Sequence, residues 1–380
     1  MEKTTKERVG WIDGVRSVAC VFIVMHHFLL AFYSDSYYGT DALGNPGGSI
    51  ALWWSQSPVS VLTNGNFWVC VFLVISGYVL SIQCFQKAEF GKIQKMLFKR
   101  YFRIALPVLV LSFIVQLMMM TNLFTNRLVS QFTDSKWLSG YYAEVPEFKQ
   151  VFLNGLIDAG FKGVNLYSNA FWMLKYVLLG GFLAYVLAII GTNRKRYIYV
   201  FYVFVLWVFY HIAIYYCAII VGVMLAHYMY YYGKQLPAYF NLFLFVLALF
   251  LGGYPTGVLK PTNVYGLLWG PDPGKTHIVG ATLFIFAISQ TPILMRLFSN
   301  GVLVRLGKIS YAIFLVHIPV LFSIGCYAFL IFYRMGVNYH VTVFTTMLIT
   351  YFFVFCIAYM FEKYVERNCS RLTNWIESKL

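Results

Sequence analysis

The first apolar stretch of the chain, residues 11–28, carries three side chains whose types suit chemistry. Its sequence, WIDGVRSVACVFIVMHHF, places Arg16, His26 and His27 in a run that otherwise predicts a membrane helix. Ionisable groups are costly in hydrocarbon and mark functional sites in membrane helices. At about 100° per residue, Arg16 and His27 return to nearly one face, roughly 16 Å apart along the axis. One stripe of this helix therefore presents a cation near its start and an imidazole deep in the bilayer.

An imidazole at position 27 suits proton transfer. With a reference pKa near 6.5, it takes a proton from a hydroxyl and returns it to a leaving group. Neighbouring positions face about 100° apart, so His27 and not His26 lies on the Arg16 stripe. The alternatives are a neutral imidazole that hydrogen-bonds another helix and an Arg16 side chain that anchors the inner boundary.

The composition predicts an all-α, polytopic integral membrane protein whose surroundings are the lipid bilayer. Of the 380 residues, 60% are hydrophobic and only 11% are charged, whereas soluble domains carry about a quarter. The net charge of +15 is then a topology signal, and no basic soluble face is available for nucleic acid. Neither the seven cysteines nor the adjacent His26 and His27 show metal-ligand spacing, so we expect no metal site.

Apolar runs long enough to cross about 30 Å of hydrocarbon predict ten helices. They fall at residues 14–33, 66–84, 104–121, 169–190, 197–211, 213–232, 239–254, 276–291, 309–332 and 341–361. Residues 197–232 form one nearly unbroken apolar tract, interrupted by His211, so a count of nine is the alternative.

The distribution of Lys and Arg places both termini in the cytoplasm. With a cytoplasmic N-terminus, every inner segment carries cations, and seven of the 29 Lys and Arg face outward. Those seven are Arg127, Lys136, Lys149, Lys162, Lys260, Lys275 and Arg334. Two outer segments, residues 34–65 and 122–168, are too long for turns, and such loops are often functional or mobile. No linker interrupts the chain, which predicts one domain over residues 1–380 without a fused extracytoplasmic domain.

Several motifs together resemble acyltransferase family 3, integral-membrane enzymes that modify cell-surface sugars and related acceptors. The first helix reads Asp13-Gly14-Val15-Arg16, then ten residues, then His27. The similarity continues through Ser76-Gly77, through Lys99-Arg100 with Arg103-Ile104 and Pro107, through Gly307-Lys308-Ile309-Ser310-Tyr311 with His317-Ile318-Pro319, and through Glu366. It spans nearly the whole chain.

The resemblance implies transfer of an acyl group, most simply acetyl, from cytoplasmic acyl-CoA to a hydroxyl of an extracytoplasmic glycan or glycolipid precursor. His27 is then the general base or a transient acyl carrier, and these two routes stay open. Lys99, Arg100 and Arg103, with Arg16, are candidates for the phosphates of coenzyme A, because guanidinium forks suit phosphate. Ser76 either allows close helix packing or offers its hydroxyl as a partner to the thioester.

The resemblance and the positions of other polar residues give candidate acceptor contacts. Trp172 lies in a segment like the family's Trp-containing helix, although Lys175 and Val177 replace the acidic residue that often follows. Lys175 either snorkels outward or meets an anionic acceptor. Ser310 and His317 share a helix face, and with Tyr311 they form either a polar seam between helices or a lining of the reaction site.

A competing interpretation is a transporter that exports a sugar or small acid without chemistry. Buried Arg and His side chains also occur along transport paths. The chain shows no inverted repeat of interrupted helices, which favours the enzyme. Under the enzyme interpretation we expect a multi-pass protein of the plasma membrane, with any acyl relay or glycan-assembly partner on a separate chain.

Overall fold

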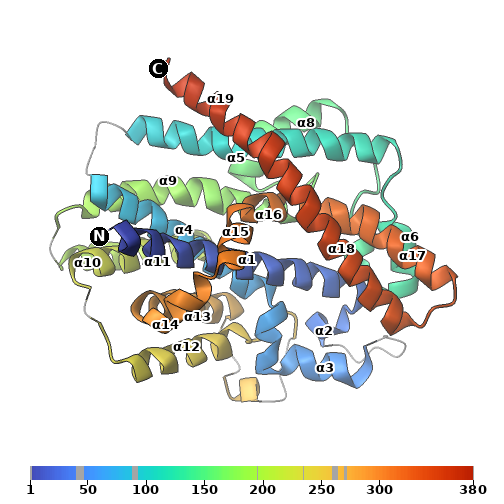
Figure 1. Cartoon of the computed structure of the whole chain (residues 1–380), viewed down its shortest axis with the longest axis horizontal. Helices are drawn as coiled ribbons and strands as arrows, with labels where there is room; N and C mark the ends of the chain where they lie inside the picture. The colour runs from blue at the N-terminus through green and yellow to red at the C-terminus, as the bar shows by residue number, and fades with distance from the viewer. Residues whose placement is uncertain are drawn as a thin grey trace. The chain divides into compact units, whose positions relative to one another are not determined.

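The chain folds into helices joined by short connections (Figure 1). The structure is a computed structural model that describes residues 2–39, 47–87, 93–194, 196–233, 235–258, 264–268 and 272–379. Within these ranges every regular element is a helix, which confirms the all-α membrane class. Lys92, Lys195, Lys234 and Lys260, which contribute to the charge distribution above, lie outside the described residues.

The chain divides into two compact units. The first unit comprises residues 1–23, 56–97 and 176–308, with the start of α1 (Glu2–Phe32), η1 (Pro58–Thr63), α4 (Gly65–Lys87), most of α9 (Leu174–Gly191), α10 (Ile198–Ile212), α11 (Ile214–Tyr231), α12 (Ala238–Gly252), η5 (Val264–Leu268), α13 (Pro273–Gln290), α14 (Pro292–Phe298) and α15 (Gly301–Lys308). The prediction of a single domain stays a prediction.

The second unit comprises residues 24–55, 98–175 and 309–380. It holds the end of α1, α2 (Asp35–Tyr38), α3 (Gly48–Gln56) except its last residue, most of α5 (Ile93–Met120), α6 (Asn126–Thr133), α7 (Lys136–Ser139), α8 (Lys149–Leu153), η3 (Asn154–Lys162), η4 (Asn169–Met173), α16 (Ser310–Val320), η6 (Leu321–Gly325), α17 (Cys326–Arg334), α18 (Tyr339–Phe361), η7 (Glu362–Glu366) and α19 (Arg367–Glu377).

Each of the ten predicted apolar runs coincides with a helix of the described chain. Seven of these helices are long and apolar enough to cross a membrane, and α13 with α14 forms an eighth candidate bent by 103°. The remaining two, α10 and α12, have 15 residues each. At 1.5 Å per residue such helices span about 22 Å, less than the hydrocarbon thickness. The number of crossings and the side of the termini stay predictions.

In the first unit, glycines let α4 and α11 approach closely. A Cβ atom at Gly77 would collide with the carbonyl of Ile219, and one at Gly222 would collide with the carbonyl of Val74. Small residues of this kind allow backbone contact between membrane helices, where the hydrophobic effect gives little drive for association. Gly77 therefore has a packing role in the Ser76-Gly77 motif.

In the second unit, α16, η6 and α17 form one continuous span, residues 310–334, most of which is buried. Pro319 lies inside α16, where proline removes a backbone donor. A π-helical segment, η6, follows directly, and Ser323 Oγ donates to the Pro319 carbonyl at 2.6 Å. Local π segments are frequent at functional sites because they change the direction of side chains.

The segment between α5 and α9, predicted as a long loop, is a folded series of short helices. Gln116 of α5 donates to the Pro146 carbonyl at 2.8 Å and accepts from the Tyr167 hydroxyl at 2.9 Å. The Tyr142 hydroxyl donates to the Tyr167 carbonyl at 2.8 Å. These bonds connect the segment to the membrane helix that precedes it, so its side chains have defined positions.

Candidate functional site

The structure brings His27 of α1 and His317 of α16 together within the second unit. Nδ1 of His27 lies 3.3 Å from Nε2 of His317, and the ring centroids are 5.0 Å apart. His317 is 1% exposed, whereas His27 is partly exposed. One imidazole is therefore enclosed by protein, and the other has access to a reactant.

Backbone carbonyls fix the tautomers of this pair. His317 Nδ1 lies 2.8 Å from the Phe314 carbonyl and 3.1 Å from the Ile313 carbonyl. A carbonyl only accepts, so Nδ1 of His317 carries the hydrogen, and in the neutral ring Nε2 then has the lone pair. That lone pair accepts from Nδ1–H of His27. The basic lone pair of His27 is consequently on Nε2, as a general base requires.

Partly exposed aromatic side chains surround the His27 ring. The Trp137 ring of α7 lies 5.4 Å from it, inclined by 31°, and His26 lies 5.0 Å away. His26 in turn contacts Tyr37 of α2 at 5.1 Å. His27 precedes the end of α1 by five residues, about 8 Å along the axis.

A basic group from α5 lies at the other end of α16. The Tyr311 hydroxyl donates to the Ile104 carbonyl of α5 at 3.1 Å. Arg100, Arg103 and Glu366 all lie within electrostatic range of that hydroxyl. The structure thus gathers Arg100, Arg103 and Tyr311, which sequence motifs had suggested separately.

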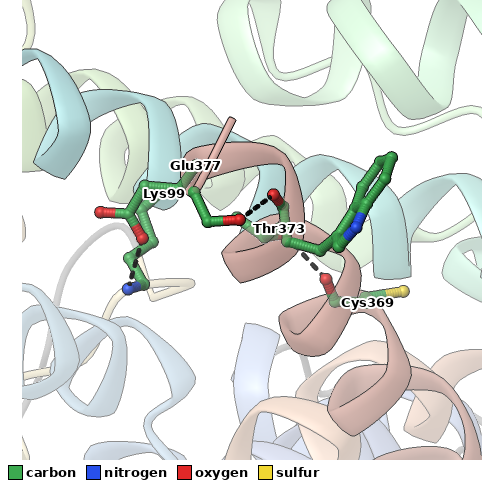
Figure 2. A network of polar contacts seen from close by, with 6 residues as sticks. Lys99, Cys369, Thr373 and Glu377 are labelled. Atoms are coloured by element: carbon green, nitrogen blue, oxygen red, sulfur yellow. Dashed lines mark hydrogen bonds and ion pairs between the residues drawn. The ribbon is translucent and has the colours of Figure 1, made fainter. Parts of the chain in front are cut away.

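Lys99 is held by the C-terminal helix. Its Nζ forms an ion pair with the Glu377 carboxylate at 3.0 Å, and Figure 2 shows the two side chains pointing toward each other. Thr373, one turn earlier in α19, donates to the Cys369 carbonyl at 2.8 Å. A phosphate at Lys99 would have to share this ammonium with Glu377 or displace the carboxylate.

Helix α16 connects the basic group to the histidine pair. Six residues separate Tyr311 from His317, which corresponds to about 9 Å along the axis. Ser310 is buried beside Tyr311 and lies on the His317 face of α16. A donor whose phosphates lie near Arg100 and Arg103 would therefore extend along α16 to reach His27.

Two predicted site residues belong to the first unit. Arg16 lies on the same helix as His27, about 16 Å away along its axis, and pairs with Asp13 at 3.7 Å. Ser76 lies on α4, next to the Gly77 contact with α11. Their proposed contacts with the donor stay predictions.

Trp172 and Lys175 lie where the segment after α5 joins α9. Gly163, with φ of +74°, ends η3 directly against the Trp172 carbonyl and the Lys175 side chain. Side chains three apart eclipse in a 3₁₀ helix, so Asn169 and Trp172 share one face of η4. Asn169 accepts a hydrogen bond from the Tyr141 hydroxyl.

Sequence reasoning missed Trp137, Tyr141 and Asn169. Trp137 and Tyr141 lie between two apolar runs, and Asn169 is the first residue of the run at 169–190, so hydropathy gives no pairing information for any of them. The one local signal is Ser135 directly before α7, a residue type that caps helices. Among the described residues, no three His, Cys, Asp or Glu side chains have an arrangement that would hold a metal ion. The expectation of a metal-free site stays a prediction.

Comparison with protein families identifies the chain. The family model described as "Acyltransferase domain" matches residues 9–363, which include both histidines and the basic group. The chain belongs to this acyltransferase family. The family resemblance predicted from the sequence motifs is thereby confirmed for this multi-pass membrane acyltransferase.

A curated relative of the acyltransferase is the O-acetyltransferase PaAT-1 of Phomopsis amygdali. The two proteins are 24% identical over 128 residues, 32% of this chain. The match covers 24% of the length of PaAT-1. No solved structure matches the acyltransferase.

Proposed function

We propose that the acyltransferase moves an acetyl group from acetyl-CoA to a hydroxyl of a glycan or glycolipid precursor across the membrane. The acyltransferase family supports the reaction class, and the PaAT-1 relative supports O-acetyl transfer. The observation that carries the proposal is the His27–His317 contact, because it gives His27 the tautomer that a base needs.

The donor binds at the basic end of the second unit. Arg100 and Arg103 hold phosphate groups of coenzyme A. Lys99 adds a third cation when its ion pair with Glu377 breaks. The pantetheine arm runs along α16 past Tyr311 and Ser310 toward His317. This end is cytoplasmic under the charge distribution of the chain.

Transfer at His27 needs one base and a positioned thioester. Nε2 of His27 removes the proton from the acceptor hydroxyl, and the oxygen attacks the thioester carbonyl carbon. The tetrahedral intermediate expels the coenzyme A thiolate as the C–S bond breaks, and the thiolate takes the proton from His27. In the covalent variant, the acyl group rests on Nε2 before the alcohol takes it. Positioning supplies much of the remaining acceleration, because a thioester is already activated.

The experiment is acyl transfer by the purified chain in lipid nanodiscs. Acetyl-CoA labelled in the acetyl group is supplied with methyl glycosides, and both free thiol and labelled sugar are measured. We expect stoichiometric release of thiol and formation of sugar ester. Binding of glycoside without consumption of the thioester would contradict the proposed reaction and favour the transporter interpretation.

The same proposal extends to the membrane, the topology and the partners of the protein. The acyltransferase lies in the plasma membrane as a single domain, with both termini in the cytoplasm, and acts on lipid-linked or assembled surface glycans. Separate glycan-assembly proteins supply the acceptor. Mass analysis of surface polysaccharide with and without the chain tests this, and an unchanged mass would contradict it.

A further inference from the structure

A group of side chains beside His27 combines aromatic faces with amides. We call Tyr37, Trp137, Tyr141, Asn165 and Asn169 the aromatic–amide cluster; all five are partly exposed and belong to the second unit. The Trp137 ring packs against His27 at 5.4 Å, and the Tyr141 ring lies 6.1 Å from Trp137. The cluster therefore begins at the proposed base and extends away from it.

Hydrogen bonds hold Trp137 in place over His27. Ser135, the N-cap of α7, donates from Oγ to the Leu30 carbonyl of α1 at 2.6 Å. The buried Asn126 side chain donates to the carbonyls of Leu138 and Tyr141, at 2.6 and 3.0 Å. These bonds fix both ends of α7, so the position of Trp137 is set by α6 and by the helix that carries His27.

A short hydrogen-bond relay orients the amides. Asn165 Nδ2 donates to the Tyr141 hydroxyl at 3.5 Å, and that hydroxyl donates to Asn169 Oδ1. Burial and the nearby Tyr38 hydroxyl raise the pKa of Tyr141, so it remains a donor at neutral pH. Oδ1 of Asn165 and Nδ2 of Asn169 have no hydrogen-bond partner among the described residues. One acceptor and one donor are thus available to a ligand.

This chemistry matches a sugar ring better than an apolar alcohol. A pyranose offers an apolar C–H face to an aromatic ring and vicinal hydroxyls that both donate and accept. An apolar alcohol would cover the amide groups without forming hydrogen bonds to them, which is unfavourable. We propose that the aromatic–amide cluster binds the sugar ring whose hydroxyl reacts at His27, with Trp137 and Tyr141 against its face and the two amides on its hydroxyls.

This inference rests on the proposed function and has its own test. The purified chain in nanodiscs is assayed with labelled acetyl-CoA and methyl glycosides, with cyclohexanol as the apolar alcohol. The variants are Trp137→Ala, Trp137→Phe and Asn169→Leu, and Trp53→Ala, at an exposed tryptophan of α3, is the matched control. Thioester hydrolysis without any alcohol reports whether the donor site and His27 remain intact.

We expect kcat/KM for the glycoside to fall about tenfold or more in Trp137→Ala and about fivefold in Asn169→Leu, where one hydrogen bond is lost. Trp137→Phe should keep most of the activity, and Trp53→Ala all of it. The KM for acetyl-CoA should stay unchanged in all variants, and the hydrolysis rate should stay unchanged in Trp53→Ala.

Normal glycoside kinetics in both Trp137→Ala and Asn169→Leu would overturn the inference while leaving acyl transfer established. Acylation of cyclohexanol in preference to every glycoside would also overturn it. A wild-type chain that consumes no thioester would instead overturn the proposed function. If Trp137→Ala fails to fold, Asn169→Leu decides alone.

Discussion

In the second unit, the contact between His317 and His27 lets one residue set the tautomer of the other. His317 is enclosed, and two carbonyls of its own helix determine which nitrogen carries hydrogen. His27 is partly exposed and receives its orientation from His317. A carboxylate orients the catalytic histidine in many hydrolases, and in the proposed reaction a neutral imidazole takes that place. Under this proposal His317 is a positioning residue that acts through His27.

Replacing His317 tests this division of roles. In His317→Leu the acceptor for His27 Nδ1–H is lost, so we expect kcat to fall about 100-fold while KM for acetyl-CoA changes little. In His317→Gln, the Gln carbonyl oxygen replaces the Nε2 acceptor, so part of the activity should return. Steady-state kinetics over pH 5–9 measure both effects, and the apparent basic pKa of the reaction should differ between the variants.

A merely structural His317 would give another pattern. Both variants would then lose folded protein together, and the molecules that did fold would retain the wild-type kcat and pH profile. Monodispersity in size-exclusion chromatography separates the two cases, because it reports the folded fraction independently of turnover.

The residues that sequence motifs identified are only part of this site. The His27 stripe, the His317 motif and the Arg100–Arg103 pair were all visible as polar residues in or beside apolar runs. Their spatial grouping was not visible, because which helices pack together is a tertiary property. Trp137 was not identified at all, since its contact with His27 depends on a hydrogen bond from Ser135 to the end of α1.

At the scale of elements, the α4–α11 contact depends on the absence of side chains. Gly77 and Gly222 lie against backbone atoms of the facing helix, with no flexible side chain that could move aside. Membrane helices associate through such close packing, so a single methyl group matters there.

Gly77→Ala should destabilise the fold by about 1–3 kcal/mol or more, as overpacking does, because the new methyl meets the Ile219 carbonyl. The expected result is a lower Tm and less monodisperse protein. Gly301→Ala is the matched control, since no other atom lies within 4 Å of its added methyl position. Equal Tm values for the two variants would mean that α4 and α11 do not pack as described.

The membrane helices followed from hydropathy, whereas the short helices between them did not. Each of the ten apolar runs coincides with a helix, because a continuous apolar stretch has one low-energy backbone in lipid, but only seven or eight of these helices are long enough to cross a membrane. Residues 122–168 are polar and irregular in sequence, and their helices are stabilised by bonds to α5, such as those of Gln116. The local sequence of this segment does not predict hydrogen bonds to residues far away in the chain.

At the scale of the whole molecule, three consecutive long helices determine whether the two outer segments lie on the same side of the membrane. If α1, α4 and α5 each cross the membrane, the segments after α1 and after α5 emerge on the same side, opposite the N-terminus. Both segments contribute aromatic residues beside His26 and His27. Acceptor binding on that side and donor binding on the other would then make the reaction transmembrane.

Cysteine labelling tests this arrangement in intact cells. Ile50→Cys and Val145→Cys place thiols at exposed positions of the two outer segments, and Ser378→Cys places one near the C-terminus. With Cys356 and Cys369 replaced by alanine, a membrane-impermeant maleimide should label positions 50 and 145 directly and position 378 only after permeabilisation. Labelling of position 378 in intact cells, or opposite behaviour of positions 50 and 145, would contradict the topology.

The most direct measurement is single-turnover acyl transfer from labelled acetyl-CoA by His27→Ala, beside the wild-type chain and the His211→Ala control. Loss of the base should slow transfer by roughly 10²–10⁴-fold. His211 is an exposed histidine of α10 outside the proposed site, so its variant should match the wild type. Transfer at the wild-type rate by folded His27→Ala would contradict a role for His27 in the reaction.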